Sequence, residues 1–525
     1  MSPDPPQRHD LGDVRRARNR DFDLSRPPKS YPEAMARPDA HVWRAAMQRE
    51  KESLDNMKAF RVTALPLGRK AIGVRWVFDF KYDEKGQRIF GKEKARLVAQ
   101  GFTQRPEDFG ETYAPVAKMT TIRAILAWAA CKDHLIFQFD VKTAFLHARN
   151  HHPVYCRQIP GYLLDDTSLV LEVLVALYGL RQSAFKWYQL FMSLLLVLGL
   201  IRCEADHGLF YGYWSSSPDP SIPMPAGGKP LVLVVPIHVD DGLGVTNSEP
   251  LYKWFISQLQ KHVQVIDLGP CSRFLSVSII RDRASRRLWF SSHLYISELL
   301  DDWHMSDCKP SQTPFLSNVL NHKAPHGVKD CPLNALPDIS DTDLKPLYQC
   351  LVGCLLYLTV SARPDIAFYV MWLGQFAANP DRAHFRLAKH VLHYLAGMRT
   401  LALCFGAPSP QTPDSLRGFL QNVGCSDADW ASNNDRRSIS GYCFFFCGSL
   451  ISWSAVKQKS IALSSTEAEY YTMTHAFREA IWIRLLFSTL GFPLPKPFPL
   501  LSDNQAALKL SASHSISSRS KHIDI

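Results

Sequence analysis

The chain has 525 residues, 46% of them hydrophobic and 21% charged, which is enough apolar material for several cores and excludes a mainly disordered protein. Its 60 lysine and arginine residues outnumber the 49 aspartate and glutamate residues, and the net charge of +11 favours a polyanionic partner such as nucleic acid. The first residues hold no apolar signal segment and no later run of about 18 uninterrupted apolar residues occurs, so we expect a protein that is not secreted and has no membrane partner.

The cysteines are scattered along the chain. Their short spacings, Cys350 to Cys354 and Cys443 to Cys447, lie in apolar runs. These spacings do not predict a zinc site or a disulfide framework. We therefore interpret the cysteines as core thiols of an intracellular protein.

The N-terminal part predicts an unstructured lead followed by mixed elements. Residues 1–39 are rich in proline, arginine and aspartate, which is typical of disorder. From about residue 40, apolar residues such as Trp43 and Met47 recur at helical spacing. The alternation in "VRWVFDF" predicts a strand, "DEKGQ" a turn, "TTIRAILAWAACKDH" a helix and "LIFQFDV" another strand.

Proline, glycine and serine mark the loops of the C-terminal half. Residues 213–230 predict a surface loop and residues 316–345 a linker. Residues 346–410 then read as a helical block, with segments such as "PDIAFYVMWLGQFAA" and "AHFRLAKHVLHYLAG". Residues 416–525 alternate strands and helices, which predicts an α/β layer with acids at strand ends.

Three aspartates stand in apolar strand surroundings. Asp240 and Asp241 interrupt "LVLVVPIHVDDGLGV", and Asp140 ends "HLIFQFD". Such a carboxylate pair repels itself unless a divalent cation neutralises it or a proton is shared. Two strand ends brought together would form an oxygen cage suited to Mg²⁺. The alternative is a plain hairpin turn, because "DDG" is ordinary turn chemistry.

A series of short motifs follows one order along nearly all of the ordered chain. They are "ARLVAQGFTQ", "ETYAPVAKMTTIRAILAWAA", "FDVKTAFLHA", "ALYGLRQSAFKWY", "HVDDGL", "LVGCLLYLTVSARPDIAFYV", "SDADWASNNDRRSISGY", "ISWSAVKQKSIALSSTEAEYY", "DNQAA" and "SRSKHIDI". In this series the sequence resembles the copia-type retrotransposon polyprotein, in which a reverse transcriptase precedes a ribonuclease H. The resemblance implies an α+β multidomain fold, with a right-hand polymerase of fingers, palm and thumb over residues 40–315. A helical connection over 346–410 and an α/β ribonuclease H-like domain over 416–525 would follow the linker.

The resemblance also implies roles for single residues of the polymerase. Asp140, Asp240 and Asp241 would be the catalytic metal ligands, with the Val141 carbonyl as a further oxygen ligand. Residues that would bind the incoming nucleotide are Lys94 and Arg96 against the triphosphate, Phe145 as a steric filter against a 2′-hydroxyl, and Tyr178 and Gly179 beneath the base. The alternatives are a solvated charged face for the lysine and arginine, and a core aromatic for the phenylalanine.

For the ribonuclease H, the resemblance implies a strand-end aspartate, a helical glutamate and a second strand-end aspartate around the metal ions. We assign these roles to Asp427, Glu467 and Asp503, with Asp524 as a fourth acid. Asp429 and Glu469 remain as alternatives to the first two. The motif around Glu467 is also typical of a helix N-cap.

The implied cofactor is Mg²⁺ or Mn²⁺, and the implied partners are an RNA template, a DNA primer, deoxynucleoside triphosphates and an RNA–DNA hybrid, in the cytoplasm, the nucleus or both. The sequence departs from the family pattern at Pro236, within a predicted central strand, and at Ser276, in place of a turn glycine. It also stops directly after the motif "KHIDI". These departures support a rival hypothesis, a catalytically impaired remnant of a retroelement that at most binds nucleic acid.

Overall fold

A computed structural model describes residues 23–24, 26–81, 88–315, 341–406, 421–431, 435–492, 494 and 498–512. They belong to two compact units that interleave along the chain. The first unit consists of Met1–Pro115, Val141–Leu198 and Gln258–Ile266, and the second of Val116–Asp140, Gly199–Ser257 and Asp267–Ile525. The predicted polymerase region 40–315 is therefore divided between the units.

The first unit packs helix α3 against small sheets. Its helices are α2 (Tyr31–Ala36), α3 (Ala40–Asn56) and α5 (Ser183–Val197). Its strands are β1 (Phe60–Ala64), β2 (Val74–Asp79), β3 (Lys94–Ala99), β5 (Tyr155–Cys156) and β6 (Leu169–Val173). Strands β2 and β3 form an antiparallel ribbon, and the other three form a sheet in the order β1-β6-β5. Trp43 and Met47 of α3 are buried in the core of this unit, at the spacing that predicted the helix.

The lead segment contains more structure than its composition predicts. Helix α2 lies within residues 1–39, and the Ser30 hydroxyl caps it by accepting the Glu33 N–H. The buried Arg37 side chain then pairs with Asp39, with 2.8 Å from Nε to Oδ1. These local polar contacts hold a segment that offers few apolar side chains, whereas residues 1–22 lie outside the described residues.

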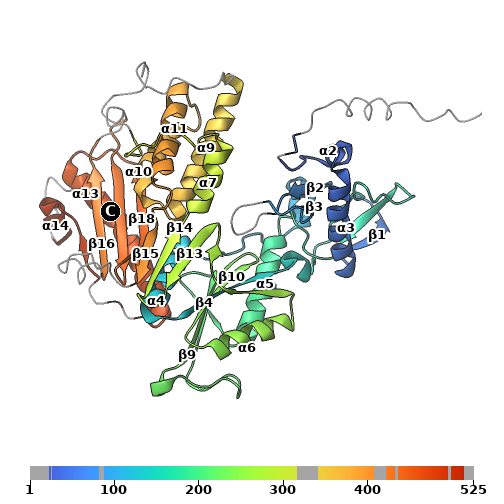
Figure 1. Cartoon of the computed structure of the whole chain (residues 1–525), viewed down its shortest axis with the longest axis horizontal. Coiled ribbons are helices and arrows are strands. Elements are labelled where there is room, and N and C mark those ends of the chain that lie inside the picture. Colours follow the sequence, from blue (N-terminus) through green and yellow to red (C-terminus); the bar gives the residue numbers. More distant parts are fainter. Residues whose placement is uncertain are drawn as a thin grey trace, which may run out of the picture. The chain divides into compact units, whose positions relative to one another are not determined.

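The second unit holds most of a six-stranded sheet in the order β11-β4-β10-β9-β8-β7. The strands are β4 (Leu135–Val141), β7 (Ile201–Arg202), β8 (Leu209–Trp214), β9 (Leu231–His238), β10 (Asp241–Thr246) and β11 (Val265–Pro270). Helix α4 (Met119–Lys132) packs against β9 and β10, and α6 (Glu249–Gln260) also borders the sheet (Figure 1). Strand alternation places Ile136 in the core shared with α4, and Phe137 and Phe139 on the other face, against Phe255 of α6.

A second, four-stranded sheet follows in the order β12-β13-β14-β15. Its strands are β12 (Arg273–Phe274), β13 (Val277–Asp282), β14 (Arg287–Ser291) and β15 (Leu403–Gly406). Strand β15 falls inside the block 346–410 that was predicted to be helical. It pairs antiparallel with β14, so the end of that block belongs to this sheet.

The rest of the predicted helical block forms a bundle around its own core (Figure 1). Its helices are α7 (His293–Asp302), α9 (Asp341–Ser361), α10 (Ala367–Gly374) and α11 (Arg382–Gly397). The bundle therefore also includes α7 from the predicted polymerase region and the start of α9 from the predicted linker. Among the described residues, one stretch, Asp343–Ser361 of α9, is long and apolar enough to cross a membrane by length and composition. Core helices of soluble proteins meet the same criteria, and Leu351 and Leu355 of this stretch are buried in the bundle core.

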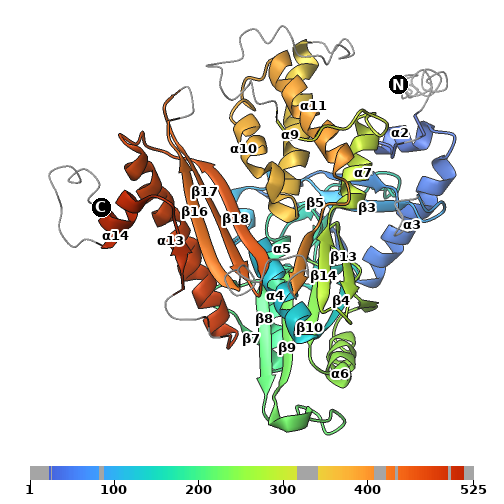
Figure 2. The ribbon, with the colours of Figure 1, turned by 60° about the vertical axis from the view of Figure 1, so that its left-hand side comes forward.

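The C-terminal segment forms a four-stranded sheet in the order β18-β17-β16-β19. Its strands are β16 (Asn422–Asp429), β17 (Ile439–Phe446), β18 (Ser449–Lys457) and β19 (Leu500–Leu501), and its helices are α13 (Ser465–Thr489) and α14 (Gln505–Ala512). Helix α13 lies along β16 and β17 (Figure 2). Strand β19 runs parallel to β16, which brings the end of "PLLSD" beside the end of "GCSDAD".

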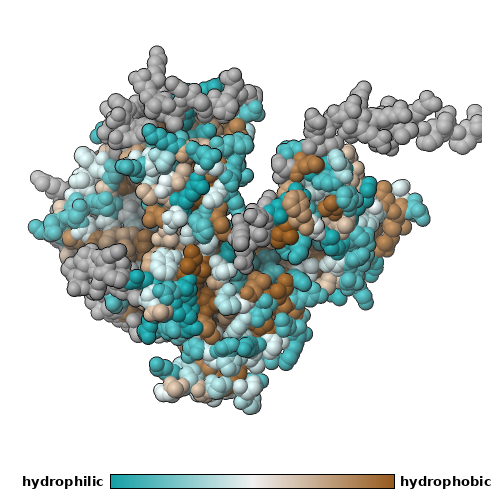
Figure 3. Space-filling model, viewed as in Figure 1, coloured by the Kyte–Doolittle hydropathy of each residue, from teal (hydrophilic) through white to brown (hydrophobic). Residues whose placement is uncertain are grey.

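The described residues of this segment share a core with helix α4. Phe444, Ile451 and Ile483 belong to the same buried cluster as Ile122 and Leu126 of α4. The ribonuclease H-like domain predicted at 416–525 lies within the second unit. On the face shown in Figure 3, hydrophilic residues are interspersed with hydrophobic patches.

Candidate active sites

The first acidic site lies where β9 turns into β10. Strand β10 pairs antiparallel with β4, and its register places Asp241 directly opposite Asp140. On its other side Asp241 pairs with His238, the last residue of β9. The turn between these strands is therefore Val239–Asp240, and the three aspartates meet at one end of the sheet.

Glycines in β10 allow this close approach. Gly242 lies opposite Phe139 and Gly244 opposite Phe137. A Cβ atom on either glycine would come within 2.0 Å of the facing phenylalanine ring. The glycine in "DDG" is therefore required for packing against β4, a reason that its turn-like context did not predict.

The turn itself is strained. Val239 has φ +61°, a left-handed conformation that a β-branched residue rarely adopts. A two-residue hairpin turn with positive φ at its first central position normally has glycine there. The two interpretations of the sequence are thus compatible, because "VDDG" forms a hairpin turn and also presents acids at the sheet end. Strain of this kind is often found at functional sites.

The electrostatics of this site fit a divalent cation. Burial, together with the charges of Asp240 and Asp140, raises the pKa of Asp241 to about 6. All three aspartates are half-buried. Negative charges gathered in this way are stabilised by a cation that takes oxygen ligands, as Mg²⁺ does. Val141, the expected fourth ligand, ends β4 with its side chain buried.

Pro236 does not break β9. The strand runs from Leu231 to His238, and its pairing with β8 continues through Leu209 and Pro236. The ladder with β10 is interrupted at Val235 and Pro236. Ile237 donates its N–H to the Gly208 carbonyl oxygen on the β8 side. Successive residues of a strand direct their backbone groups to opposite sides, so the nitrogen of Pro236 faces β10. Because proline has no N–H to donate, the ladder between β9 and β10 has a gap at this position.

The residues expected to bind the nucleotide lie in the first unit. Lys94 and Arg96 are on β3, and the Arg96 guanidinium is 6.0 Å from the ring centroid of Tyr178. The rings of Tyr178 and Phe145 are 4.8 Å apart between centroids. Gly179 has φ +88°, and a Cβ there would come within 2.2 Å of the Ala99 carbonyl oxygen. The glycine thus permits close contact with β3, and its role beneath a base stays a prediction.

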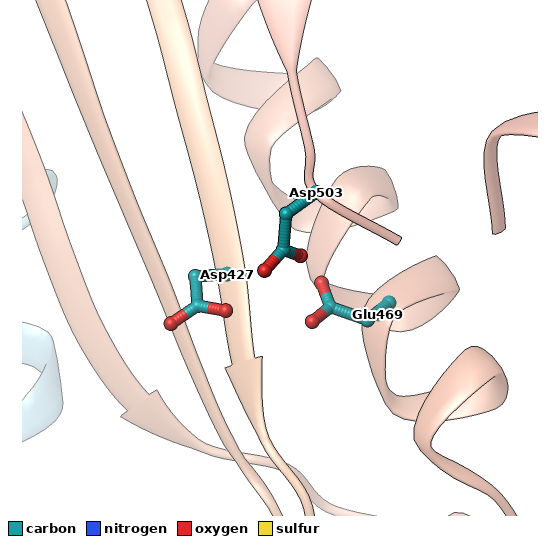
Figure 4. Close-up of side chains that lie close together, drawn as sticks. All are labelled: Asp427, Glu469 and Asp503. Atoms are coloured by element: carbon teal, nitrogen blue, oxygen red, sulfur yellow. The ribbon is translucent and has the colours of Figure 1, made fainter. Parts of the chain in front are cut away.

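The second acidic site joins β16, α13 and the segment after β19. Ligand oxygens of Asp427, Glu469 and Asp503 all lie within 4.8 Å of one another (Figure 4). Asp427 and Asp503 are exposed, and Glu469 is buried. Burial and the charges of Asp427 and Asp503 raise the pKa of Glu469 to about 7, despite a 3.2 Å hydrogen bond in which the Ala428 N–H donates to its Oε1.

This group also fits a divalent cation. The Glu469 Oε2 atom is buried and has no hydrogen-bond partner. A buried carboxylate oxygen without a partner is costly, and a cation held by the three carboxylates would satisfy it.

The helical acid in this group differs from the one expected. Glu467 is buried in the first turn of α13, where its Oε2 accepts the Leu463 N–H at 2.7 Å and its own N–H donates to Ser464 Oγ. It caps the helix, and the alternative Glu469 takes the place beside Asp427. Asp429, the other alternative, ends β16 and is not in the group. Asp524 lies outside the described residues.

Comparison with known proteins shows which family the chain resembles. Residues 57–317 match the family described as "Reverse transcriptase (RNA-dependent DNA polymerase)". The chain is 34% identical to the retrovirus-related Pol polyprotein from transposon TNT 1-94 of Nicotiana tabacum, over 95% of this chain and 35% of that protein. It is 33% identical to the Pol polyprotein from transposon RE1 of Arabidopsis thaliana, over 92% of this chain and 30% of that protein.

The chain thus spans about a third of the length of these relatives. A solved structure of the foamy viral protease-reverse transcriptase in complex with double-stranded DNA matches 89% of this chain and 64% of its own, with 10% identity and a TM-score of 0.42. The motifs, the family match and the Pol relatives agree, and the chain belongs to the copia-type retrotransposon Pol polyproteins and carries their reverse transcriptase domain.

Proposed function

We propose that this chain is an RNA-directed DNA polymerase that also cleaves the RNA strand of RNA–DNA hybrids. The observation that carries the proposal is the pairing of Asp241 with Asp140 beside Asp240 at a sheet end, within the segment that matches the reverse transcriptase family. The group Asp427, Glu469 and Asp503 supports the second activity.

Each acidic group would hold Mg²⁺ or Mn²⁺ through its carboxylate oxygens. When bound, such cations activate an attacking hydroxyl or water and stabilise the leaving oxygen in phosphoryl transfer. The strained Val239–Asp240 turn and the close contact of Gly242 with Phe139 fix the aspartates before substrate arrives. At the second site, Glu469 is fixed by the Ala428 N–H, so its free oxygen faces Asp427 and Asp503.

The substrates that we propose are an RNA template, a DNA primer and deoxynucleoside triphosphates for the polymerase, and an RNA–DNA hybrid for the nuclease. The excess of 60 basic over 49 acidic residues favours such polyanions. Lys94, Arg96, Phe145, Tyr178 and Gly179 keep the nucleotide-binding roles that the resemblance implies, and the proposed site of action is intracellular.

Primer extension on poly(rA)/oligo(dT) tests the polymerase. Asp240→Asn should lower incorporation by roughly a hundredfold or more, because it removes a charge that the reaction centre requires. Asp302→Asn, at an exposed position on α7, is the matched control and should extend primers like the wild type. Equal signals from the wild type and Asp240→Asn would contradict the proposal and favour an impaired remnant.

A labelled RNA–DNA hybrid tests the nuclease independently. Asp427→Asn should abolish release of labelled RNA, and Asp240→Asn should leave that release unchanged. Loss of both activities in both variants would indicate a folding defect, which circular dichroism of each variant checks.

A further inference from the structure

Two cysteines face each other across the C-terminal sheet. In the antiparallel pair β16–β17, Cys425 and Cys443 are Cα partners. Both residues are free cysteines of intermediate exposure. Facing residues of an antiparallel pair place their side chains on the same face of the sheet, so the two thiols are neighbours within reach of small solutes.

The backbone fixes their separation. Gly424 donates its N–H to Pro499, on the side away from β17, so Cys425 directs its backbone groups toward β17 and forms a hydrogen-bonded pair with Cys443. Cα atoms in such pairs are about 5.5 Å apart, which is within the usual range for a disulfide. The Cβ atoms of facing residues are somewhat farther apart than a relaxed disulfide prefers, roughly 4.5–5.5 Å against about 3.8 Å. A bridge here is thus feasible but easily reduced.

We propose that Cys425 and Cys443 form a modification site that reacts with small disulfides such as oxidised glutathione. The Cys425 thiol loses its proton and attacks one glutathione sulfur, which releases the first glutathione thiol and leaves a mixed disulfide. Cys443 then loses its proton and attacks the Cys425 sulfur, which releases the second glutathione thiol. Two cysteine thiols are oxidised, one glutathione disulfide is reduced, and the two protons end on the released thiols.

The bridge would lie next to the second acidic site. Asp427 follows Cys425 by two residues on β16, so both side chains lie on the same face of the strand. Gly441, the Cα partner of Asp427, precedes Cys443 by two residues on β17. A disulfide between the strands would therefore fix the stretch of β16 that presents Asp427.

Another thiol pair provides a contrast. Cys350 and Cys354 lie on consecutive turns of α9. Helical residues four apart have Cβ atoms about 5–6 Å apart, and the helix prevents their approach. This pair should stay reduced under conditions that oxidise Cys425 and Cys443.

Peptide mapping of the full chain tests the proposal. The protein is incubated with oxidised glutathione, its remaining thiols are alkylated, and it is digested without reductant for mass spectrometry. We expect most of the Cys425 peptide to be linked to the Cys443 peptide, and to be released by mild dithiothreitol. Cys443→Ser should instead accumulate a glutathione adduct on Cys425, and Cys350→Ser should preserve the link.

Alkylated free thiols at both positions in the wild type, or stable glutathione adducts on both, would overturn the proposal. This readout requires no polymerase or nuclease activity, so its failure is distinct from failure of the proposed function.

Discussion

At the scale of single residues, Glu467 and Glu469 have different roles although they are two positions apart on α13. Residues two apart on a helix point about 200° apart, so one faces the loop before the helix and the other faces β16. The sequence pattern predicts a helical glutamate at this place. It does not determine which of the two faces the strand, because that depends on how α13 packs on the sheet.

Substitution by glutamine should separate these roles. Without divalent cations, Glu469→Gln should raise the free energy of unfolding, because the carboxylate is buried beside like charges, and it should abolish hybrid cleavage. Glu467→Gln should lower that free energy by about 0.5–1 kcal/mol, since it removes charge at a helix N-terminus, and should leave cleavage within a few-fold of the wild type. Urea denaturation and the labelled-hybrid assay measure both effects, and loss of cleavage in Glu467→Gln alone would reverse the assignment.

Ser276 replaces a turn glycine of the family pattern and has a strained backbone. It follows Leu275 in the two-residue turn between β12 and β13. Leu275 has φ +48° and Ser276 has φ +60°. Both central positions of such a turn favour glycine or asparagine. The serine therefore occupies a position that favours glycine.

We expect Ser276→Gly to raise the free energy of unfolding by about 1 kcal/mol, because glycine adopts this conformation without steric cost. Ser276→Ala is the control, since it removes the hydroxyl but keeps the Cβ atom, and should give no gain. Thermal denaturation of the wild type and the two variants measures the changes in stability. A gain in Ser276→Gly alone would indicate relief of backbone strain. An equal change in both variants would indicate that the lost hydroxyl contact is the cause.

At the scale of elements, β4, β9 and β10 lie where alternating and continuous apolar runs predicted strands. Sequence periodicity could not reveal the register, and it is the register that brings Asp241 opposite Asp140 and Gly242 against Phe139. The short strand β15 was missed because a four-residue segment carries too little periodicity to stand out beside long helices.

Pro236→Val should strengthen the sheet. It restores an N–H that faces the gap in the β9–β10 ladder, at a buried position where valine suits a strand. We expect the free energy of unfolding to rise by about 1 kcal/mol, the usual net contribution of one hydrogen bond. Urea denaturation measures the change. A loss of stability would show that the proline ring fills space that valine cannot.

At the scale of the whole second unit, the C-terminal sheet shares its core with α4. The sequence predicted a domain boundary near residue 416 because the elements change character there. A signal of the shared core was nevertheless present in the sequence, since residues Ala124 to Ala130 ("AILAWAA") are all apolar, and the structure buries each of them. A helix that is apolar on all sides needs cover on all sides, and in this unit β18 and the C-terminal core residues provide part of it.

Arg123 of α4 holds this arrangement together. Its side chain donates to the carbonyl oxygens of Ile451 on β18, at 2.7 Å, and of Val360 at the end of α9, at 2.6 Å. Its guanidinium carbon lies 3.8 Å from the ring centroid of Trp453. Burial lowers the pKa of Arg123 to about 9, so the side chain remains protonated at neutral pH and its hydrogen bonds are charge-assisted.

Arg123→Met should therefore lower the free energy of unfolding by about 3 kcal/mol, because it keeps the length of the side chain but leaves buried carbonyl groups without their donors. Arg283→Met is the matched control in the same unit. It removes an exposed ion pair with Asp133 and should cost less than about 1 kcal/mol. Urea denaturation followed by tryptophan fluorescence compares the two variants. Equal losses would show that Arg123 does not join α4 to the C-terminal sheet, and that apolar contacts alone hold the shared core.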